Sequence, residues 1–426
     1  MSNTMSEEIQ ERTTGPEAAA DTLKRNRQIL EGDRTLWIIY AVLIVVSILV
    51  VYSSTAKMAY DITSDMTTTD SLRQQLMLVM TMSLPVIFVA HKINYTFYRR
   101  ITPMAYYLFV ILTVATYFVG ATTNGAARWL PIGPIQFQPS EGLKIFTILM
   151  LARRMETRQS SINKLKLLPT SWRLNSPKQQ KILRENTRPL LGPVILSCMV
   201  IFPAHTSSAV IIFIASVIML YIGRASKLEL FKFCLLVGIV GTLGLGMLSL
   251  VGIGRGDTAG GRLSTWITEW TTDGEKNFTY ELSDTERAMI AIRNGGIMGE
   301  GAGHSSSRAV VIHPESDYAY AFFTSEYGII AALVLMLLYL WITFRSIEIC
   351  RRCNTAFPTL MTAGLGLLIT CQAMLHILVQ VNLIPETGQT LPLISRGGSS
   401  LLFMSLAIGM IISVSRMPIV TKKHKE

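Results

Sequence analysis

Among the residues whose chemistry could be catalytic, an acidic pair, Glu315 and Asp317, has the most unusual position. Both lie in the stretch 301–326, GAGHSSSRAVVIHPESDYAYAFFTSE, where a polar loop leads into a long apolar segment. An ionisable group in the hydrocarbon of a membrane costs about 2.5 kcal/mol or more at the centre, so those that occur there are often paired or functional. Asp317, at the mouth of the apolar segment, is therefore the first candidate for a catalytic residue.

A second set of polar residues lies in the stretch 125–144, GAARWLPIGPIQFQPSEGLK. Pro139 suits the first turn of a helix, since its missing N–H costs nothing there. Glu141 and Lys144 are three residues apart on one face of that helix and can form an ion pair. The pair either neutralises itself in a place of low dielectric or lines a polar cavity, where Lys144 or Arg128 could hold a phosphate. Spacing alone leaves both interpretations open.

Gln372, His376 and Gln380 recur every four residues in an apolar stretch, so they form one polar stripe on a predicted helix. Such a stripe should face the interior of a helix bundle. Hydrogen bonding between helices is favoured over a path for substrate as its explanation. The stretch 382–400 that follows mixes prolines, glycines and hydroxyl residues, and irregular backbone of this kind is tolerated where it lines a cavity or packs on protein.

The elements that must position these residues are long apolar segments. Half of the 426 residues are apolar and only 16% are charged. Runs of about 18 or more apolar residues cross a bilayer core of roughly 30 Å as helices. The sequence predicts an all-α polytopic membrane protein whose membrane domain covers 35–418. Its ten predicted spans lie near residues 36–54, 75–91, 103–120, 139–153, 189–203, 208–223, 229–253, 319–344, 359–381 and 399–416.

The net charge of +11 follows the predicted topology, because every second loop is basic, most strongly the stretch 153–188. This positive-inside pattern places both termini in the cytoplasm. It also explains the basic excess by topology and attraction to anionic lipid headgroups, so nucleic acid is not an expected partner. The polar stretch 1–34 is predicted to be a disordered cytoplasmic tail, and 419–426 forms a second cytoplasmic tail.

The longest predicted outer segment, 254–318, separates the seventh and eighth spans. A connection of this length is either functional or partly helical. Ser283 and Glu286 have the spacing of a capping box, so the stretch 281–292 predicts a short helix. The glycine-rich stretch 295–303 lacks the preceding strand and the G-K-[ST] of a phosphate loop, which favours a flexible turn that lets the backbone approach a substrate or the bilayer.

Four motifs in a fixed order resemble the FtsW/RodA family, also called SEDS glycosyltransferases. They are ARW...QPSEGLK (127–144), AIRNGGIMGEGAGHS (291–305), PESDYAYAFFTSEYG (314–328) and PETGQTLPLISRGGSS (385–400), and the resemblance covers essentially the whole membrane region. Members of that family are ten-helix membrane enzymes that polymerise lipid II, an undecaprenyl-pyrophosphate-linked disaccharide peptide, into glycan strands. They work with a class B penicillin-binding protein, which crosslinks the strands.

The resemblance implies roles for individual residues. The family's essential aspartate, at the outer start of the eighth helix, matches Asp317, which would be the general base in the first turn of that helix. The polar residues that would bind substrate are Arg128, Gln138, Glu141, Lys144, Ser395, Arg396 and Ser399. The need for a divalent cation is left open. The sequence itself predicts no metal site, because the one C-x-x-C pair, Cys350 and Cys353, has no second pair of ligands.

The chain departs from the family pattern at three places. Arg396 replaces the tyrosine of the usual S-Y-G-G-S-S, and Glu315-Ser316 replace the usual His-Thr before the aspartate. The family's P-D-L-G-T is not matched by PAHTSSA (203–209), so the role of its aspartate is not transferred. Substrate contacts around Arg396 and His205 are therefore left open.

On this resemblance the protein is expected to be an inverting glycosyltransferase of the bacterial inner membrane, with lipid pyrophosphate as the leaving group. Chemistry at the outer face cannot rely on nucleotide sugars, and a lipid-linked phosphate arrives already activated. The polar N-terminal tail favours the FtsW branch, which serves cell division, and other division proteins are then further partners. A lipid II flippase and a non-catalytic division scaffold are the alternatives.

Overall fold

The computed structural model describes residues 31–54, 68–123, 126–132, 135–160, 162, 183–251, 261–262, 266–267 and 282–417. The helices that overlap the predicted spans are α3 (Arg34–Ser54), α4 (Thr68–Leu78) with α5 (Leu84–Ala90), α6 (Tyr95–Val119), α7 (Pro139–Thr157), α9 (Arg188–Ile201), α10 (Thr206–Ile222), α11 (Lys227–Val251), α14 (Ala319–Arg352), α15 (Ala356–Gln380) and α16 (Gly398–Ser415). The other elements are the π-helical turns η2 (Val79–Ser83) and η4 (Leu183–Thr187), the short helices α13 (Asp284–Gly295) and η5 (Ser306–Ala309), and the strands β1 (Ala121–Thr123), β2 (Ala126–Ile132) and β3 (Ile135–Phe137).

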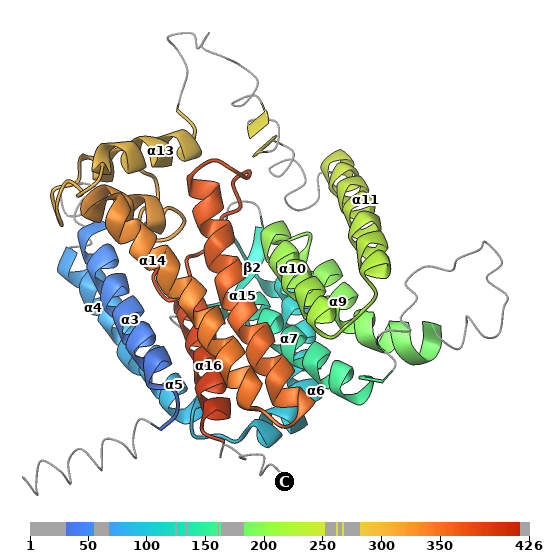
Figure 1. The fold of residues 1–426 in the computed structure, drawn as a ribbon. Helices are drawn as coiled ribbons and strands as arrows, with labels where there is room; N and C mark the ends of the chain where they lie inside the picture. Colours follow the sequence, from blue (N-terminus) through green and yellow to red (C-terminus); the bar gives the residue numbers. More distant parts are fainter. Residues whose placement is uncertain are drawn as a thin grey trace, which may run out of the picture.

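The prediction of a polytopic helical membrane protein is confirmed, because each predicted span falls on a helix of this bundle (Figure 1). Within the described residues, six helices are long and apolar enough to cross a membrane: Arg34–Ser54, Asp70–Ala90, Tyr95–Val119, Ala319–Arg352, Ala356–Gln380 and Gly398–Ser415. Two shorter apolar helices are α9 and α10. The number of ten membrane crossings stays a prediction.

Helices α15 and α16 form the centre of the bundle. In their most apolar stretches 72% and 78% of the residues are buried, against 22% in α6. Helix α15 packs against α14, α7, α10 and α16, and α7 is buried without interruption from Pro139 to Ala152. Polar groups on α7 and α15 therefore face protein, whereas α6 turns a broad apolar face outward.

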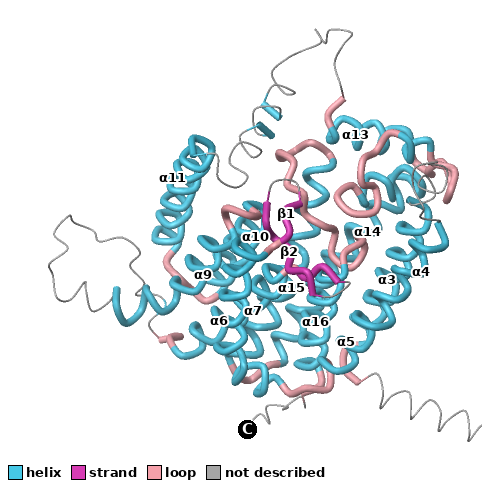
Figure 2. The backbone as a smooth tube through the Cα atoms, turned by 180° about the vertical axis from the view of Figure 1, so that it is seen from behind, coloured by secondary structure: helices cyan, strands magenta, loops and turns pink. Residues whose placement is uncertain are grey.

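A small antiparallel sheet, β1-β2-β3, is absent from the all-α prediction (magenta in Figure 2). Its register pairs Ala121 with Trp129 and Leu130 with Phe137. The strands are too short for a clear alternation of apolar and polar residues, and this is why the sequence did not predict them. The sheet leads the chain from the end of α6 into α7, so it sets the position of the first turn of α7.

The two ends of the bundle's chain lie close together. The N–H of Asp33, just before α3, donates to Ser415 Oγ at the end of α16, at 2.8 Å. Asp33 also forms an ion pair with Arg345, and Arg416 pairs with Glu31. This arrangement fits the prediction that both termini lie on one side with the basic loops. The helix α3 begins at Arg34, while the rest of the predicted tail, and most of the loop 153–188, lies outside the described residues.

The outer segment confirms the predicted short helix. Helix α13 begins after Ser283, whose side chain accepts the N–H of Glu286 while the Glu286 carboxylate accepts the N–H of Ser283. This reciprocal pair is the capping box that the sequence predicted.

The glycine-rich stretch after α13 packs against a kink in α14. Gly328 has φ +81° there, so the helix breaks its own hydrogen-bond ladder. The glycine-rich stretch supplies the missing donors, because Glu300 and Gly301 donate their N–H groups to the carbonyls of Ser325 and Glu326, at 2.9 and 3.0 Å. Gly295 and Gly299 approach the backbone of α14, since a methyl group at either position would meet the carbonyl oxygens of Thr324 and Glu326. An approach of this stretch to a substrate or the bilayer stays a prediction.

Candidate active site

Asp317 lies in a turn, residues 314–318, that leads into α14. The helix begins at Ala319 and its cap residue is Tyr318, so no acidic residue occupies the first helical turn. The prediction that Asp317 belongs to that turn is wrong by two residues, because the chain folds back over 314–318 before the helix starts. Asp317 is half-buried.

Three consecutive carbonyl groups of this turn accept hydrogen bonds from elsewhere in the protein. The Arg396 N–H donates to Glu315 O at 2.7 Å, and Ser395 Oγ donates to Ser316 O at 2.6 Å. The side-chain amide of Gln380 donates to Asp317 O at 3.0 Å. A backbone held at three successive positions has little freedom, so the Asp317 carboxylate is presented in a fixed place.

Ser395 and Arg396, predicted to bind substrate, position this turn. Ser395 is buried, and its hydroxyl also accepts the N–H of Leu391 at 2.8 Å, so both its donor and an acceptor site are used within the protein. The Arg396 side chain is half-buried and donates to Gln74 on α4. Direct contact of either residue with substrate stays a prediction.

Tyr318, next to Asp317, is a further polar residue of the turn that the sequence analysis did not select. Its hydroxyl donates to Glu386 Oε1 at 2.9 Å, and burial together with the Glu386 carboxylate raises the pKa of Tyr318 well above its usual value. Glu386 also lies 3.6 Å from Arg262, measured from Oε2 to Nε. The neutral Tyr318 hydroxyl thus links the Asp317 turn to the stretch 382–400.

Glu141 and Lys144 form the expected ion pair inside the bundle. Lys144 Nζ lies 2.8 Å from Glu141 Oε1, and the two side chains are 0% and 4% exposed. Lys144 also donates to Gln372 Oε1 on α15 at 2.7 Å. The other carboxylate oxygen, Glu141 Oε2, and the neighbouring Ser140 Oγ are buried and have no hydrogen-bond partner among the described atoms. The pair is therefore mutually neutralised but leaves an acceptor site open.

The polar stripe of α15 connects this pair to the Asp317 turn. Gln372 donates to Thr390 O at 3.1 Å, and His376 Nδ1 donates to Gln389 O at 2.7 Å. The amide of Gln380 donates to His376 Nε2 as well as to Asp317 O, while its oxygen accepts the N–H of Ala321. The favoured explanation of the stripe, hydrogen bonding to neighbouring elements, is confirmed. Eight residues separate its ends, or about 12 Å along the helix.

His205, in the stretch that departs from the family pattern, joins the same network. It is buried at the start of α10, and Gln389 Nε2 lies 2.9 Å from its Nδ1. The same amide nitrogen lies 2.9 Å from Ser207 Oγ and 3.0 Å from Ser208 Oγ. Polar residues of PAHTSSA therefore hold the stretch 382–400 against α10.

Gln138 and Ser399 lie where two helices begin. The Gln138 N–H donates to Ser399 Oγ at 2.9 Å, and the Ser399 hydroxyl donates to Gln136 O at 3.2 Å. Gln138 caps α7 and Ser399 is in the first turn of α16, so the N-terminal ends of these helices meet. Arg128 is placed on β2, while its side chain lies outside the described part of the structure.

Glu326, in the same motif as Asp317 (314–328), is buried, and one oxygen of its carboxylate accepts several hydrogen bonds. Its Oε1 accepts the N–H of Gly303 at 3.0 Å, lies 3.2 Å from Arg308 Nη2, and accepts the hydroxyl of Ser53 on α3. These contacts fasten the glycine-rich stretch to α14. Glu326 is thus bound within the protein, and Asp317 is the better placed of the two to meet a substrate.

The profile of the FtsW/RodA/SpoVE family, described as a cell cycle protein, matches residues 33–418. This chain belongs to the FtsW/RodA/SpoVE family.

Relatives of known name support the same assignment. Over 389 residues the chain is 26% identical to stage V sporulation protein E of Bacillus subtilis, covering 90% of this chain and 97% of that protein. It is 31% identical over 315 residues to a probable peptidoglycan glycosyltransferase FtsW of Coxiella burnetii, covering 72% and 76% of the two chains. The resemblance to the FtsW/RodA family seen in the sequence motifs is confirmed.

Solved structures share the fold of this FtsW/RodA/SpoVE protein. The rod shape determining protein RodA of Thermus thermophilus matches with a TM-score of 0.56 and 19% identity, over 91% of this chain and 97% of RodA. A chain from a peptidoglycan synthase complex, described as coordinating polymerization and crosslinking, matches with a TM-score of 0.61 and 18% identity, over 91% and 98%. The architecture of the family is therefore present over nearly the whole chain.

Proposed function

We propose that this protein is a peptidoglycan glycosyltransferase that polymerises lipid II at the outer face of the cytoplasmic membrane. The observation that carries the proposal is the turn that presents Asp317, held by hydrogen bonds and connected through the polar stripe of α15 to the buried pair Glu141 and Lys144. Relatives named as peptidoglycan glycosyltransferases support the same reaction class.

In the proposed reaction the 4-hydroxyl of one sugar attacks the anomeric carbon of another. The new C–O bond forms as the bond to the lipid pyrophosphate breaks, and a single displacement of this kind inverts the anomeric centre. Asp317 accepts the proton of the attacking hydroxyl, which is only weakly acidic and needs a carboxylate within about 3 Å. The fixed carbonyls of residues 315–317 support this role, because a general base must be held in place before the substrate arrives.

The leaving pyrophosphate requires a positive environment, and three helices supply part of it. Helices α7, α14 and α16 start near the same outer loops: Ser399 ties α7 to α16, and Ser395 ties the loop before α16 to the turn before α14. Each helix N-terminus carries the equivalent of about half a positive charge. Arg128 and Arg396 are the proposed side-chain contributors at this end.

A divalent cation would help to neutralise the negative charge of the leaving pyrophosphate. Within the described residues, no three His, Cys, Asp or Glu side chains lie close enough together to hold a metal ion. Mg²⁺ is often bound through substrate phosphates together with one or two carboxylates.

The proposed partner is a class B penicillin-binding protein, which would crosslink the new strands. Support comes from the fold shared with a chain of a peptidoglycan synthase complex that combines polymerization and crosslinking. A role in cell division, with other division proteins, is the proposed setting, because several relatives are named FtsW. The similarity to stage V sporulation protein E keeps sporulation as an alternative setting for the same reaction.

One assay tests the proposal. Purified protein is incubated with lipid II, alone and with the class B partner, and both glycan polymer and the movement of lipid II across vesicle membranes are measured. Polymer indicates the proposed enzyme. Movement without polymer would identify a lipid II flippase, and neither activity would leave a non-catalytic division scaffold.

A further inference from the structure

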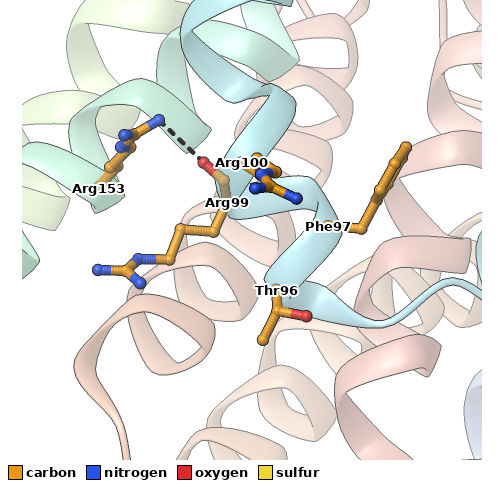
Figure 3. A pocket seen from close by; sticks show the side chains of 5 residues that line it. All are labelled: Thr96, Phe97, Arg99, Arg100 and Arg153. Carbon is orange, nitrogen blue, oxygen red and sulfur yellow. Dashed lines mark hydrogen bonds between the residues drawn. The ribbon is translucent and has the colours of Figure 1, made fainter.

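A groove of about 540 Å³ lies at the end of the bundle opposite the Asp317 turn. It is lined by Thr96, Phe97, Arg99, Arg100 and Arg153, from the start of α6 and the end of α7 (Figure 3). The neighbouring loop carries His91, whose carbonyl accepts a hydrogen bond from Arg416 at the end of α16. The groove thus belongs to the end that holds the chain termini, which the positive-inside pattern predicts to face the cytoplasm.

The groove carries more positive than negative charge. Arg99 is paired with Glu156, its Nε lying 2.8 Å from the carboxylate. Arg153 donates to the carbonyl oxygen of Arg99 at 3.0 Å, and Arg100 is exposed. Among the described residues neither Arg100 nor Arg153 has a carboxylate partner. Two guanidinium groups are therefore available to an anion.

Arg153 is held in place as well as charged. It is half-buried, and its Nη1 donates to Arg99 O, which fixes one end of the guanidinium (Figure 3). A planar guanidinium that is already oriented loses less freedom on binding a phosphate, and its fork of donors fits two phosphate oxygens. This is a better phosphate ligand than a mobile surface lysine.

An exposed apolar stripe on α6 begins at the groove. Phe97 is 50% exposed, and further along come Met104, Leu108 and Ile111, which are 71%, 50% and 66% exposed. Their separations of seven, four and three residues place them on one face of the helix, the face that also carries Arg100. Cationic groups at the foot of a long apolar face match an amphiphile with a phosphate at one end.

We propose that this groove binds the phosphate headgroup of an anionic phospholipid of the cytoplasmic leaflet, with its acyl chains along the apolar stripe of α6. Basic pockets between membrane helices on the cytoplasmic side suit such headgroups. A soluble phosphate would use the arginines alone, whereas a phospholipid would use both the arginines and the apolar stripe. Arg153 lies 14 residues after Pro139 on α7, about 21 Å along the helix that carries Glu141 and Lys144. The bound lipid would therefore brace the far end of a helix of the proposed active site.

The test uses the full-length protein in detergent with phosphatidylglycerol or phosphatidylcholine as the probe, and counts bound lipids by native mass spectrometry. The variant is Arg100→Gln with Arg153→Gln. The matched control is Arg351→Gln with Arg352→Gln, which removes two exposed arginines from the last turn of α14 at the same predicted face. The groove variant should bind phosphatidylglycerol about 30-fold more weakly, and the control should bind it as the parent protein does.

Three other results would overturn the proposal. If the groove variant and the control lost phosphatidylglycerol binding equally, the lipid would be attracted by the positive charge of the whole face and not by the groove. Displacement of phosphatidylglycerol by millimolar inorganic phosphate would assign the groove to a soluble anion. Unchanged phosphatidylglycerol binding by the groove variant would show that Arg100 and Arg153 do not bind the lipid. Thermal unfolding in phosphatidylcholine shows whether the groove variant is folded. If it is not, the single variant Arg153→Gln is measured instead, and it should bind phosphatidylglycerol about fivefold more weakly than the parent protein. No lipid II is involved, so the outcome is independent of the proposed polymerisation.

Discussion

The side-chain amide of Gln380, in the last turn of α15, donates a hydrogen bond to the main-chain carbonyl of Asp317 at 3.0 Å. The other N–H of the same amide is used by His376, and its oxygen accepts the N–H of Ala321. One buried side chain thus fixes the turn before α14 and the first turn of that helix. Its full set of hydrogen bonds makes α15 the element that decides where the Asp317 carboxylate lies.

Replacing Gln380 by Leu should slow polymerisation between about tenfold and a hundredfold while changing KM little. The change frees the Asp317 carbonyl and shifts the turn, and a displacement of about 1 Å can cost a factor of about 100. Steady-state kinetics with lipid II give both constants. The matched control is Thr370→Val, which removes a buried hydroxyl of α15 bonded to Tyr339 O and costs stability of about 1 kcal/mol. Equal losses of kcat in both variants would show that general loosening of α15 is the cause.

Either Glu141→Ala or Lys144→Ala should abolish folding or activity. Each leaves a buried charge without its partner, which costs about 3–5 kcal/mol. The charge-swapped double variant, Glu141→Lys with Lys144→Glu, restores the pair. Thermal unfolding and polymerisation are then measured together. Recovery of stability without activity favours a contact with substrate, whereas recovery of both shows that the pair is only structural.

Gly328→Ala should destabilise the protein and loosen the outer segment. At φ +81° an L-residue pays about 1–2 kcal/mol, and the added methyl group would overlap the carbonyl oxygen of Ile297. The melting temperature in detergent should fall. As the control, Gly241→Ala adds the same methyl group on α11, where it meets no atom within 4 Å apart from the nearby backbone of its own helix, and should leave stability unchanged or raise it by up to about 1 kcal/mol. An unaltered melting temperature for Gly328→Ala would mean that the kink is not needed.

The sequence predicted the features that depend on local spacing. Apolar runs located the helices, three-residue spacing paired Glu141 with Lys144, and four-residue spacing placed Gln372 and Gln380 on one polar face. These follow from helix periodicity alone.

The features that depend on contacts between distant residues could not be predicted. Ser395 holds the carbonyl of Ser316 from 79 positions away, and Gln380 reaches Asp317 over 63 positions. At the kink around Gly328, backbone groups of α14 that lack a partner in their own helix form hydrogen bonds with the glycine-rich stretch instead. No sequence pattern predicts that these two segments meet. Motif resemblance found Asp317 and Ser395 but did not give Ser395 its positioning role.

The predicted topology places Trp129, Asp273 and Asp317 outside the cell and the loop 153–188 inside. Single cysteines at Trp129, Asp273 and Gln180 are introduced after the five native cysteines are replaced. The outer two should react with an impermeant thiol reagent in intact cells, and Gln180→Cys should react only after lysis. The opposite pattern, with Gln180→Cys labelled and Asp273→Cys protected, would reverse the protein in the membrane and end the proposal of an enzyme at the outer face.

Asp317→Asn tests the proposed general base directly. The amide keeps the shape of the side chain and leaves the main-chain carbonyl free to accept from Gln380, so the turn should stay in place. It cannot take the proton of the attacking hydroxyl. Loss of a general base costs a factor of about 100 to 10,000, or roughly 3–5 kcal/mol of barrier. The variant should insert into the membrane, bind its class B partner and polymerise lipid II at least about a hundredfold more slowly.

The matched control for Asp317→Asn is Glu315→Gln, two residues earlier in the same turn. The side chain of Glu315 is 13% exposed and lies 3.9 Å from His313, so the control removes a carboxylate of the same turn without touching Asp317. Its rate should stay within a few-fold of the parent, since the carbonyl that Arg396 binds is unchanged. If instead Glu315→Gln were slow and Asp317→Asn near normal, Glu315 would be the base. Glu326 is a weaker candidate, because its carboxylate is buried and one of its oxygens is already bound by Gly303 and Arg308.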